Sequence, residues 1–216
     1  MKADCLKIMV LLLISLISTI EVVAQNGRRL HGNEEQSFKQ KMIEYSQNIE
    51  TLQAIFVQER TSDLIVETAI STGVLMFQSP SMLRWEYVEP LPSTLILNGS
   101  NAILLDRNNQ RITGNERMLA QLGGVIVSMI NGSGIAQNRQ FSSVVYELDN
   151  QKMLVVLTPT QRQLRNVYNR IELKIDQNTM LASQIILNER SGDRTVILLD
   201  NKILNSEIPT SKFAIR

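Results

Sequence analysis

Apolar residues recur with two different spacings along this chain, and each spacing predicts a different element. Phe38, Met42, Tyr45 and Ile49 follow one another at intervals of four, three and four residues, which places them on one stripe of an amphipathic helix. Asn33, with Gln36 three residues later, has capping-box spacing, so we expect the helix to begin there. Residues 25–33 would form a flexible leader, and the helix would pack on a sheet.

From residue 51 onward the apolar period shortens to two, which is typical of half-buried strands. Prolines and the Asn98-Gly99 pair separate the segments. The stretches 106–109 and 176–179 have the composition of turns. The predicted strands are 53–60, 66–78, 82–88, 93–98, 103–105, 152–158, 167–176, 181–188 and 195–199, while 141–148 fits either a helix or a strand.

The middle of the chain interrupts this alternation with two helical pieces. Thr113 and Glu116 have capping-box spacing ahead of the first piece, and Gly123-Gly124 separates it from residues 125–130. The second piece is apolar on nearly every face, so it must be buried or must cover a hydrophobic opening. Asn131-Gly132 is a plausible C-cap for it.

About ten antiparallel strands cannot remain flat in one open sheet. The economical arrangement is a curled sheet with helices over its open side. We therefore predict a mainly β (α+β) fold: an incomplete, strongly curved antiparallel β-barrel with an N-terminal helix and a helical lid over a hydrophobic cavity.

The N-terminus has the pattern of a secretory signal peptide. Lys2 and Lys7 precede an apolar run from Ile8 to Ile20, and a polar segment follows Ala24. The run is shorter than the roughly 20 residues that a membrane-spanning helix needs. We expect residues 1–24 to be cleaved, leaving a single domain of residues 25–216 in the periplasm.

Composition excludes several kinds of chemistry. The formal net charge of +1 creates no strong field that would attract nucleic acid. The one cysteine, Cys5, lies in the predicted signal segment, and the one histidine, His31, lies in the predicted leader. Nucleophile–base pairs and thiolate metal sites are therefore missing, as are a phosphate loop and a nucleophile elbow. We predict a monomer without enzymatic activity, metal or cofactor.

The strands from residue 73 to 98 carry more apolar residues than one face requires. Leu75 and Phe77 share a face, while Val74 and Met76 occupy the opposite one. Such a sheet could pack one face against a core helix and present the other to a ligand. An ordinary two-sided core is the alternative that this pattern leaves open.

A longer motif runs through the same region. It reads Phe56-x-Gln58, then Gly73-Val74-Leu75-Met76-Phe77-x-x-Pro80-x-x-Leu83-Arg84-Trp85-x-Tyr87-x-x-Pro90, then Leu97-Asn98-Gly99-x-x-Ile103. This order resembles the LolA family of periplasmic lipoprotein carriers. Weaker similarity continues to Ile208-Pro209-x-Ser211-x-Phe213 near the end of the chain.

The resemblance implies a carrier that shuttles lipoproteins from the inner to the outer membrane, with their acyl chains held in the cavity. It implies three partners: acylated lipoproteins, an inner-membrane lipoprotein-releasing ABC transporter complex and an outer-membrane acceptor. It places the lid on residues 125–130 and the barrel lip near Leu83 and Trp85. Together with the strand pattern, it predicts an acyl-chain site made of Leu75, Phe77, Leu83, Trp85, Tyr87, Leu95, Leu97, Ile126, Met129 and Ile130.

Two alternatives and one departure accompany this interpretation. The same fold could serve a periplasmic lipid or lipoprotein sensor or a dedicated-pathway carrier, or it could belong to a structural envelope protein whose apolar faces are all core. The family has an arginine before the first motif proline that holds the lid closed, and this chain has Ser79 there. Arg84 and Arg60 are the candidate substitutes.

Overall fold

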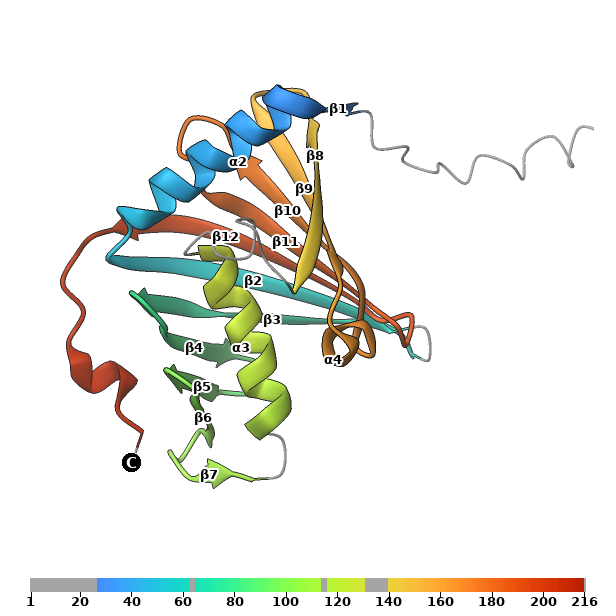
Figure 1. Ribbon diagram of the computed structural model, residues 1–216. Helices are drawn as coiled ribbons and strands as arrows, with labels where there is room; N and C mark the ends of the chain where they lie inside the picture. Colours follow the sequence, from blue (N-terminus) through green and yellow to red (C-terminus); the bar gives the residue numbers. More distant parts are fainter. Residues whose placement is uncertain (1–26, 63–64, 114–115, 131–139, 216) are drawn as a thin grey trace, which may run out of the picture.

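One antiparallel sheet of twelve strands forms most of the molecule (Figure 1). The computed structural model describes residues 27–62, 65–113, 116–130 and 140–215. The strands are β1 (Arg28–Arg29), β2 (Thr51–Ser62), β3 (Ile65–Gln78), β4 (Met82–Glu89), β5 (Ser93–Asn98), β6 (Asn101–Asp106), β7 (Arg111–Ile112), β8 (Phe141–Glu147), β9 (Lys152–Pro159), β10 (Tyr168–Asp176), β11 (Ala182–Glu189) and β12 (Arg194–Leu204).

The strand order is β1-β8-β9-β10-β11-β12-β2-β3-β4-β5-β6-β7. Strands β2 to β7 and strands β8 to β12 each follow one another as hairpins, and the pairing of β2 with β12 joins the two groups. The sheet curls but does not close, because β1 and β7 remain as its edges. This confirms the predicted incomplete barrel.

Two long helices cover the same face of the sheet, which we call the inner face (Figure 1). They are α2 (Gly32–Gln47) and α3 (Glu116–Ile130). Phe38 and Met42 of α2 share one hydrophobic core with the inner residues of both strand groups and with Ile126 and Met129 of α3. The short helix α4 (Arg162–Arg165) connects β9 to β10.

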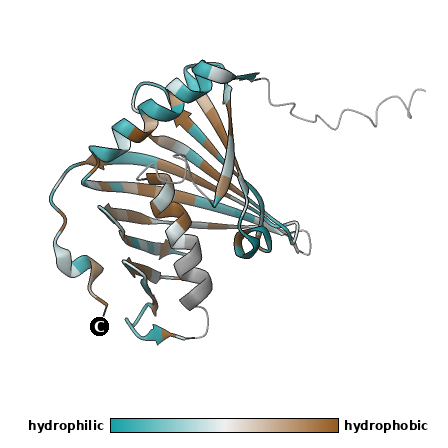
Figure 2. Ribbon diagram, viewed as in Figure 1, coloured by the Kyte–Doolittle hydropathy of each residue, from teal (hydrophilic) through white to brown (hydrophobic). Residues whose placement is uncertain are grey.

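The C-terminal segment covers part of the opposite, outer face. A 3-10 helix, η1 (Thr210–Phe213), packs on β4 and β5. Phe213 is fully buried there, and Ile96 and Ile103 are almost so. Figure 2 shows the apolar colouring that runs along the strands facing α2 and α3.

Most predicted strands are confirmed, with ends shifted by a few residues, and 141–148 is resolved as strand β8. The prediction for residues 28–33 was wrong. Arg28 and Arg29 pair with Glu147 and Tyr146, and the helix begins at Gly32, with His31 rather than Asn33 as its N-cap. Arg28 bridges Glu34 and Glu147, both at 2.8 Å, which ties this segment to α2 and β8.

The two predicted helical pieces are one continuous helix, so the expectation that Gly123-Gly124 separates them was also wrong. The predicted capping box of Thr113 and Glu116 spans residues 114–115, which lie outside the described residues, as does the predicted C-cap at Asn131-Gly132. The turns at 106–109 and 176–179 are confirmed. In each, the first aspartate accepts a hydrogen bond from the backbone N–H two residues later, at 2.8 Å for Asp106 and 3.0 Å for Asp176.

Candidate functional site

Three rows of side chains cross strands β2 to β5 on the inner face. Leu75 lies opposite Ala54 on β2 and Trp85 on β4, and Trp85 in turn lies opposite Leu95 on β5. A second row joins Leu52, Phe77, Leu83 and Leu97 in the same way, and a third joins Phe56, Gly73 and Tyr87. Because side chains alternate along a strand, the sheet places every strand residue of the predicted site on this one face.

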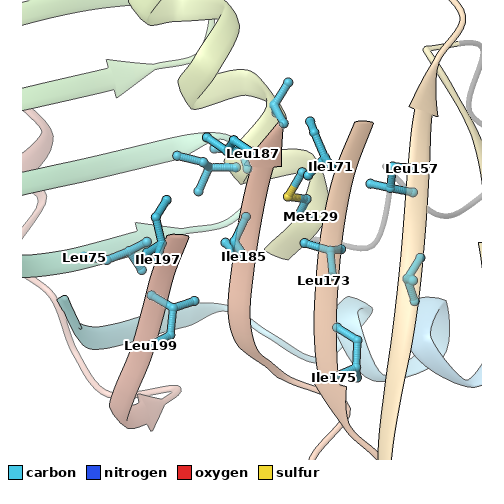
Figure 3. Packing of buried hydrophobic residues seen from close by; sticks show 14 of the residues in the cluster. Leu75, Met129, Leu157, Ile171, Leu173, Ile175, Ile185, Leu187, Ile197 and Leu199 are labelled. Atoms are coloured by element: carbon cyan, nitrogen blue, oxygen red, sulfur yellow. The ribbon is translucent and has the colours of Figure 1, made fainter. Parts of the chain in front are cut away.

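The three residues of the predicted lid, Ile126, Met129 and Ile130, pack on the same face of the sheet as these rows. Ile126 and Met129 of α3 are 3% and 8% exposed, and Ile130 packs against the same core. Met129 lies among Ile171, Leu173 and Ile185 of β10 and β11 (Figure 3). All ten predicted site residues therefore belong to, or pack against, one hydrophobic cluster.

The sequence had suggested a core helix on one sheet face and a ligand on the other. The arrangement differs, because the helices and the predicted site share the inner face. On the outer face, Ile96 is buried near the C-terminal segment, while Val74 and Met76 are half-buried. Periodicity separates the two faces of a strand but does not indicate which face a helix covers.

Gly123 sets how closely α3 approaches the sheet. A Cβ at this position would lie 1.9 Å from the Leu97 Cδ1 atom and 3.0 Å from its Cγ. Only glycine permits this approach, because a methyl group would occupy the space of the buried Leu97 side chain. Gly124, the next residue, is exposed and has nothing near its Cβ direction.

Two adjoining cavities lie between α3 and the sheet, and Ile126 lines both. The first, which we call the apolar cavity, has a volume of about 40 Å³. Met42, Leu75, Met129 and Met180 are among its lining residues, and Lys202 is the one charged residue among those described. The Lys202 ammonium donates a 2.7 Å hydrogen bond to the Leu199 carbonyl, and burial lowers its pKa.

The second, which we call the mixed cavity, has a volume of about 160 Å³. Its apolar side is formed by Trp85, Leu95, Leu104, Ile126, Leu187 and Ile197. Its polar side is formed by Gln58, Arg60, Tyr87, Tyr168, Glu189 and Thr195. Of this polar side, the sequence predicted Tyr87 as a site residue and Arg60 as a candidate lid arginine. The other four residues were missed, and the only sequence signal for Gln58 was its alternation with Phe56 and Arg60 along β2.

Three aromatic rings gather beside the mixed cavity. The ring centroids of Phe56 and Trp85 are 4.3 Å apart, and Tyr87 stands edge-on to Phe56 at 5.3 Å. The Tyr87 hydroxyl donates a 3.0 Å hydrogen bond to Gln58. Burial raises the pKa of Tyr87, although Gln58, Trp85 and Arg60 act in the opposite direction.

Trp85 carries an unsatisfied donor. Its ring is 3% exposed, and its indole N–H makes no hydrogen bond with any described residue. The indole lies next to the Tyr87 side chain, with their ring centroids 6.4 Å apart, and it lowers the pKa of the Tyr87 hydroxyl. A buried donor without a partner costs about 1–3 kcal/mol.

The two candidate lid arginines have different positions. Arg84 lies away from the inner face, where its guanidinium contacts Glu86 at 2.7 Å and the Lys212 carbonyl at 3.3 Å. It therefore does not hold α3. Arg60 lines the mixed cavity with Ile126, and it binds Asp193 at 2.9 Å, with Glu189 at 3.9 Å.

Within the described residues, three or more His, Cys, Asp or Glu side chains do not gather in a way that could hold a metal ion. Over the same part of the chain, no helix combines the length and hydrophobicity needed to cross a bilayer.

Comparison with solved structures finds distant similarity. A LolA superfamily protein from Nitrosomonas europaea is 12% identical, with a TM-score of 0.46 over 82% of this chain and 97% of that one. A chain of the MucA/MucB complex from Pseudomonas aeruginosa is 10% identical, with a TM-score of 0.46 over 85% of this chain and 61% of that one. LprF from Mycobacterium bovis is 13% identical, with a TM-score of 0.40 over 82% and 97%.

No curated protein matches this sequence. The family model described as outer membrane lipoprotein carrier protein LolA, in contrast, matches residues 47–216. This match covers β2 to β12, α3 and η1, and therefore all ten residues of the predicted site. The chain belongs to the LolA family.

Proposed function

We propose that this protein binds the acyl chains of lipoproteins between α3 and the inner face of the sheet, and carries them through the periplasm to the outer membrane. One observation carries the proposal: Ile126 of α3 lines both cavities, over a continuous apolar surface. Displacement of this side chain would join the cavities into one trough. The predicted site residues would then line the trough.

The present cavities are too small for such a ligand. A cavity of about 150 Å³ holds a benzene molecule, so 40 and 160 Å³ cannot hold a chain of about 16 carbons. Exposing that chain to water would cost on the order of 12 kcal/mol at about 0.8 kcal/mol per methylene. The cargo must therefore replace the contacts that Ile126 and Met129 make with the sheet, and α3 must move outward.

Methionine side chains suit this exchange. Met42, Met129 and Met180 line the apolar cavity, and the flexible thioether chain adapts to irregular ligands. Such a surface covers an acyl chain without the close complementarity that would prevent its release. The carrier would need no catalytic group, because binding and release follow from competition between α3 and the cargo for the same surface.

The proposed route involves an inner-membrane lipoprotein-releasing ABC transporter complex as donor and an outer-membrane lipoprotein acceptor as recipient. It also requires residues 1–24 to act as a cleaved signal peptide and residues 25–216 to act as a monomeric carrier. Sequencing the N-terminus of the protein purified from a periplasmic extract would test the cleavage site.

Native mass spectrometry of residues 25–216 tests the binding step. We expect one-to-one binding of a triacylated lipopeptide and no binding of the same peptide without acyl chains. If the folded protein bound neither peptide, the inner face would be ordinary core and the carrier proposal would fail.

A matched pair of variants locates the binding surface. Ile126→Glu places a charge between the two cavities, and we expect it to weaken lipopeptide binding at least tenfold, since an unpaired buried charge costs more than the 1.4 kcal/mol that tenfold represents. Ile55→Glu makes the same change on the outer face, where Ile55 is 45% exposed, and should leave binding unchanged. Circular dichroism of both variants checks that they fold. Equal binding by Ile126→Glu and the unmodified protein would argue against α3 as the lid.

A further inference from the structure

The inner face differs in polarity between its two cavities. The apolar cavity has Lys202 as the one charged residue in its described lining, whereas polar groups form a whole side of the mixed cavity. Because Ile126 lines both cavities, a ligand that displaced Ile126 would contact both at once. A long ligand in the joined trough would therefore have one apolar end and one polar end.

The polar end borders water. Half of the Arg60 side chain is exposed, at 51%, and Glu189 beside it is 22% exposed. A lipid joined to a polypeptide must keep that junction near solvent, since the polypeptide cannot enter the apolar interior. The mixed cavity is therefore the end of the trough where the head of an acylated cargo can lie.

The charges at this end favour a neutral ligand group. The Arg60 guanidinium is bound to Asp193 at 2.9 Å and faces Glu189 at 3.9 Å. Two carboxylates surround one cation, so the cluster offers no excess positive charge to an anion. A phosphate or a carboxylate would meet net repulsion there, while an uncharged carbonyl oxygen would not.

The Trp85 indole N–H, a buried donor without a partner among the described residues, favours a ligand group that accepts a hydrogen bond. The Trp85 indole N–H has no partner among the described residues, although Trp85 lines the mixed cavity and its ring is almost fully buried. An indole nitrogen can only donate a hydrogen bond. The indole nitrogen has almost no accessible surface in this structure, so a neutral carbonyl oxygen would satisfy this donor by entering beside Trp85 and Tyr87 as the cargo displaces neighbouring side chains.

We propose that the mixed cavity holds the ester or amide carbonyl groups of the cargo lipid against the Trp85 N–H, while the acyl chains extend into the apolar cavity. This inference rests on the proposed function and gives the cargo a direction. The carbonyl could come from the acyl esters of a lipoprotein or from those of a phospholipid, which share this chemistry.

The single tryptophan of the sequence allows the direction to be measured in the unmodified protein. The probes are two diacylated lipopeptides whose acyl chains carry bromine either next to the carbonyl or next to the terminal methyl, and a matching pair of phosphatidylglycerols. We expect bromine near the carbonyl to quench Trp85 fluorescence more strongly than bromine near the methyl end. Equal or reversed quenching by bound lipid would overturn the proposed direction and leave the carrier function standing. Absence of binding by all four lipids in native mass spectrometry would overturn both.

An ester-to-ether comparison tests the hydrogen bond and the source of the carbonyl. The unmodified protein should bind a diester lipopeptide about two- to tenfold more tightly than its diether analogue, which is the range for one hydrogen bond. Trp85→Phe should remove this preference, so that the ratio of the diester affinity to the diether affinity falls to about one. An ester preference seen with the lipopeptide but not with phosphatidylglycerol would assign the carbonyl to lipoproteins, and the reverse would assign it to phospholipids. Equal weakening of both lipids by Trp85→Phe would show a packing role and overturn the hydrogen bond.

Discussion

At the residue scale, Gly73 permits a very close approach of backbone and ring on the inner face. A Cβ there would lie 2.0 Å from the Glu86 carbonyl oxygen and 2.4 Å from the Phe56 ring. The ring thus covers the glycine and leans toward Trp85 and Tyr87. Backbone cannot move aside as a flexible side chain can, so the aromatic group beside the mixed cavity depends on the missing side chain at position 73.

Gly73→Ala should therefore destabilise the protein by about 1–3 kcal/mol, the usual cost of overpacking a core. For a domain of this size, each kcal/mol corresponds to a decrease in Tm of about 2–4 °C. Calorimetry of Gly73→Ala beside Thr72→Ala, a half-buried neighbour on the outer face, measures the effect. Equal Tm values for the two variants would contradict this account of Gly73.

Asp176 organises the turn between β10 and β11 through its charge. Its carboxylate accepts hydrogen bonds from the Lys152 ammonium at 2.6 Å and from the backbone N–H groups of Asn178 at 3.0 Å and Thr179 at 3.2 Å. These donors, with Lys152 first, lower the pKa of Asp176 from 3.8 to about 2. A carboxyl with a lowered folded-state pKa stabilises the fold above its unfolded-state pKa and loses this contribution as pH falls.

We expect an NMR titration to place the Asp176 pKa near 2, and Lys152→Met to raise it toward 3.8. The stability difference between the unmodified protein and Asp176→Asn should be constant above about pH 4. It should decline between about pH 4 and pH 2. An unshifted Asp176 pKa would show that the turn does not depend on the ionised carboxylate.

At the element scale, α3 is held by shape rather than by charge. Gly123 lies against Leu97, and Ile126 and Met129 are buried in the core. Arg60 is bound to Asp193 and Glu189, and the Lys202 ammonium is bonded to the Leu199 carbonyl, so neither of these two cations is committed to α3. A lid held by apolar contact can be displaced by an apolar ligand of similar area. The adjacent glycines of α3 allow this idea to be tested with the same substitution at two positions.

Gly124→Ala should stabilise the helix by up to about 1 kcal/mol, because alanine has the higher helix propensity and the site is open. Gly123→Ala makes the same change in propensity but pushes α3 away from Leu97. Hydrogen exchange should therefore accelerate in α3 of Gly123→Ala, and lipopeptide should bind this variant more tightly, because less of the free protein is in the closed state. Identical exchange in the two variants would mean that the close approach at Gly123 does not control the lid.

The sequence predicted elements well where an element was long enough to show its period. The strands from β2 to β6 alternate clearly, and their turns carry Pro, Gly or Asp, so both existence and type were correct. β1 and β7 contain two residues each, which is too short for any period to be visible. The pair Gly123-Gly124 was interpreted as a break, but a glycine can also serve close packing inside a helix, and local sequence does not separate these roles.

The candidate site, like the elements, could be predicted only as far as local patterns in the sequence reach. Alternation placed Leu75, Trp85 and Leu95 on common faces, and the structure brings them together with the lid residues. Apart from Tyr87, the polar side of the mixed cavity was not predicted as part of the site, because it combines Gln58 and Arg60 with Tyr168 and Glu189 from distant strands. Such a combination arises from the pairing of β12 with β2, which no local pattern encodes.

At the scale of the whole molecule, the pairing of β12 with β2 joins two strands that are far apart in sequence. We call this pairing the seam. Leu52 lies opposite Leu204, and the Asn205 side chain accepts a hydrogen bond from the Glu50 N–H and donates one to the Asn48 carbonyl, both at 2.9 Å. The partners in the first of these bonds are 155 residues apart in sequence. The intervening chain must bring these partners together before the seam can form, and contacts of such high sequence separation slow folding.

Because of this seam, the sheet cannot be completed until β12 has formed and paired with β2. A ribosome delivers residues in order, so β2 has no β12 neighbour until residues 194–204 have been made. During that interval the sheet is incomplete and β2 has an open edge, which is where unwanted strand pairing starts. We expect a chain that ends at Arg190 to show neither a cooperative thermal transition nor lipopeptide binding, as judged by circular dichroism and native mass spectrometry. A cooperatively folded truncation would show that the two strand groups assemble independently. If the truncation stays unfolded, the proposed affinity for acylated cargo can arise only after β12 has been made, and shorter nascent chains cannot compete for that cargo.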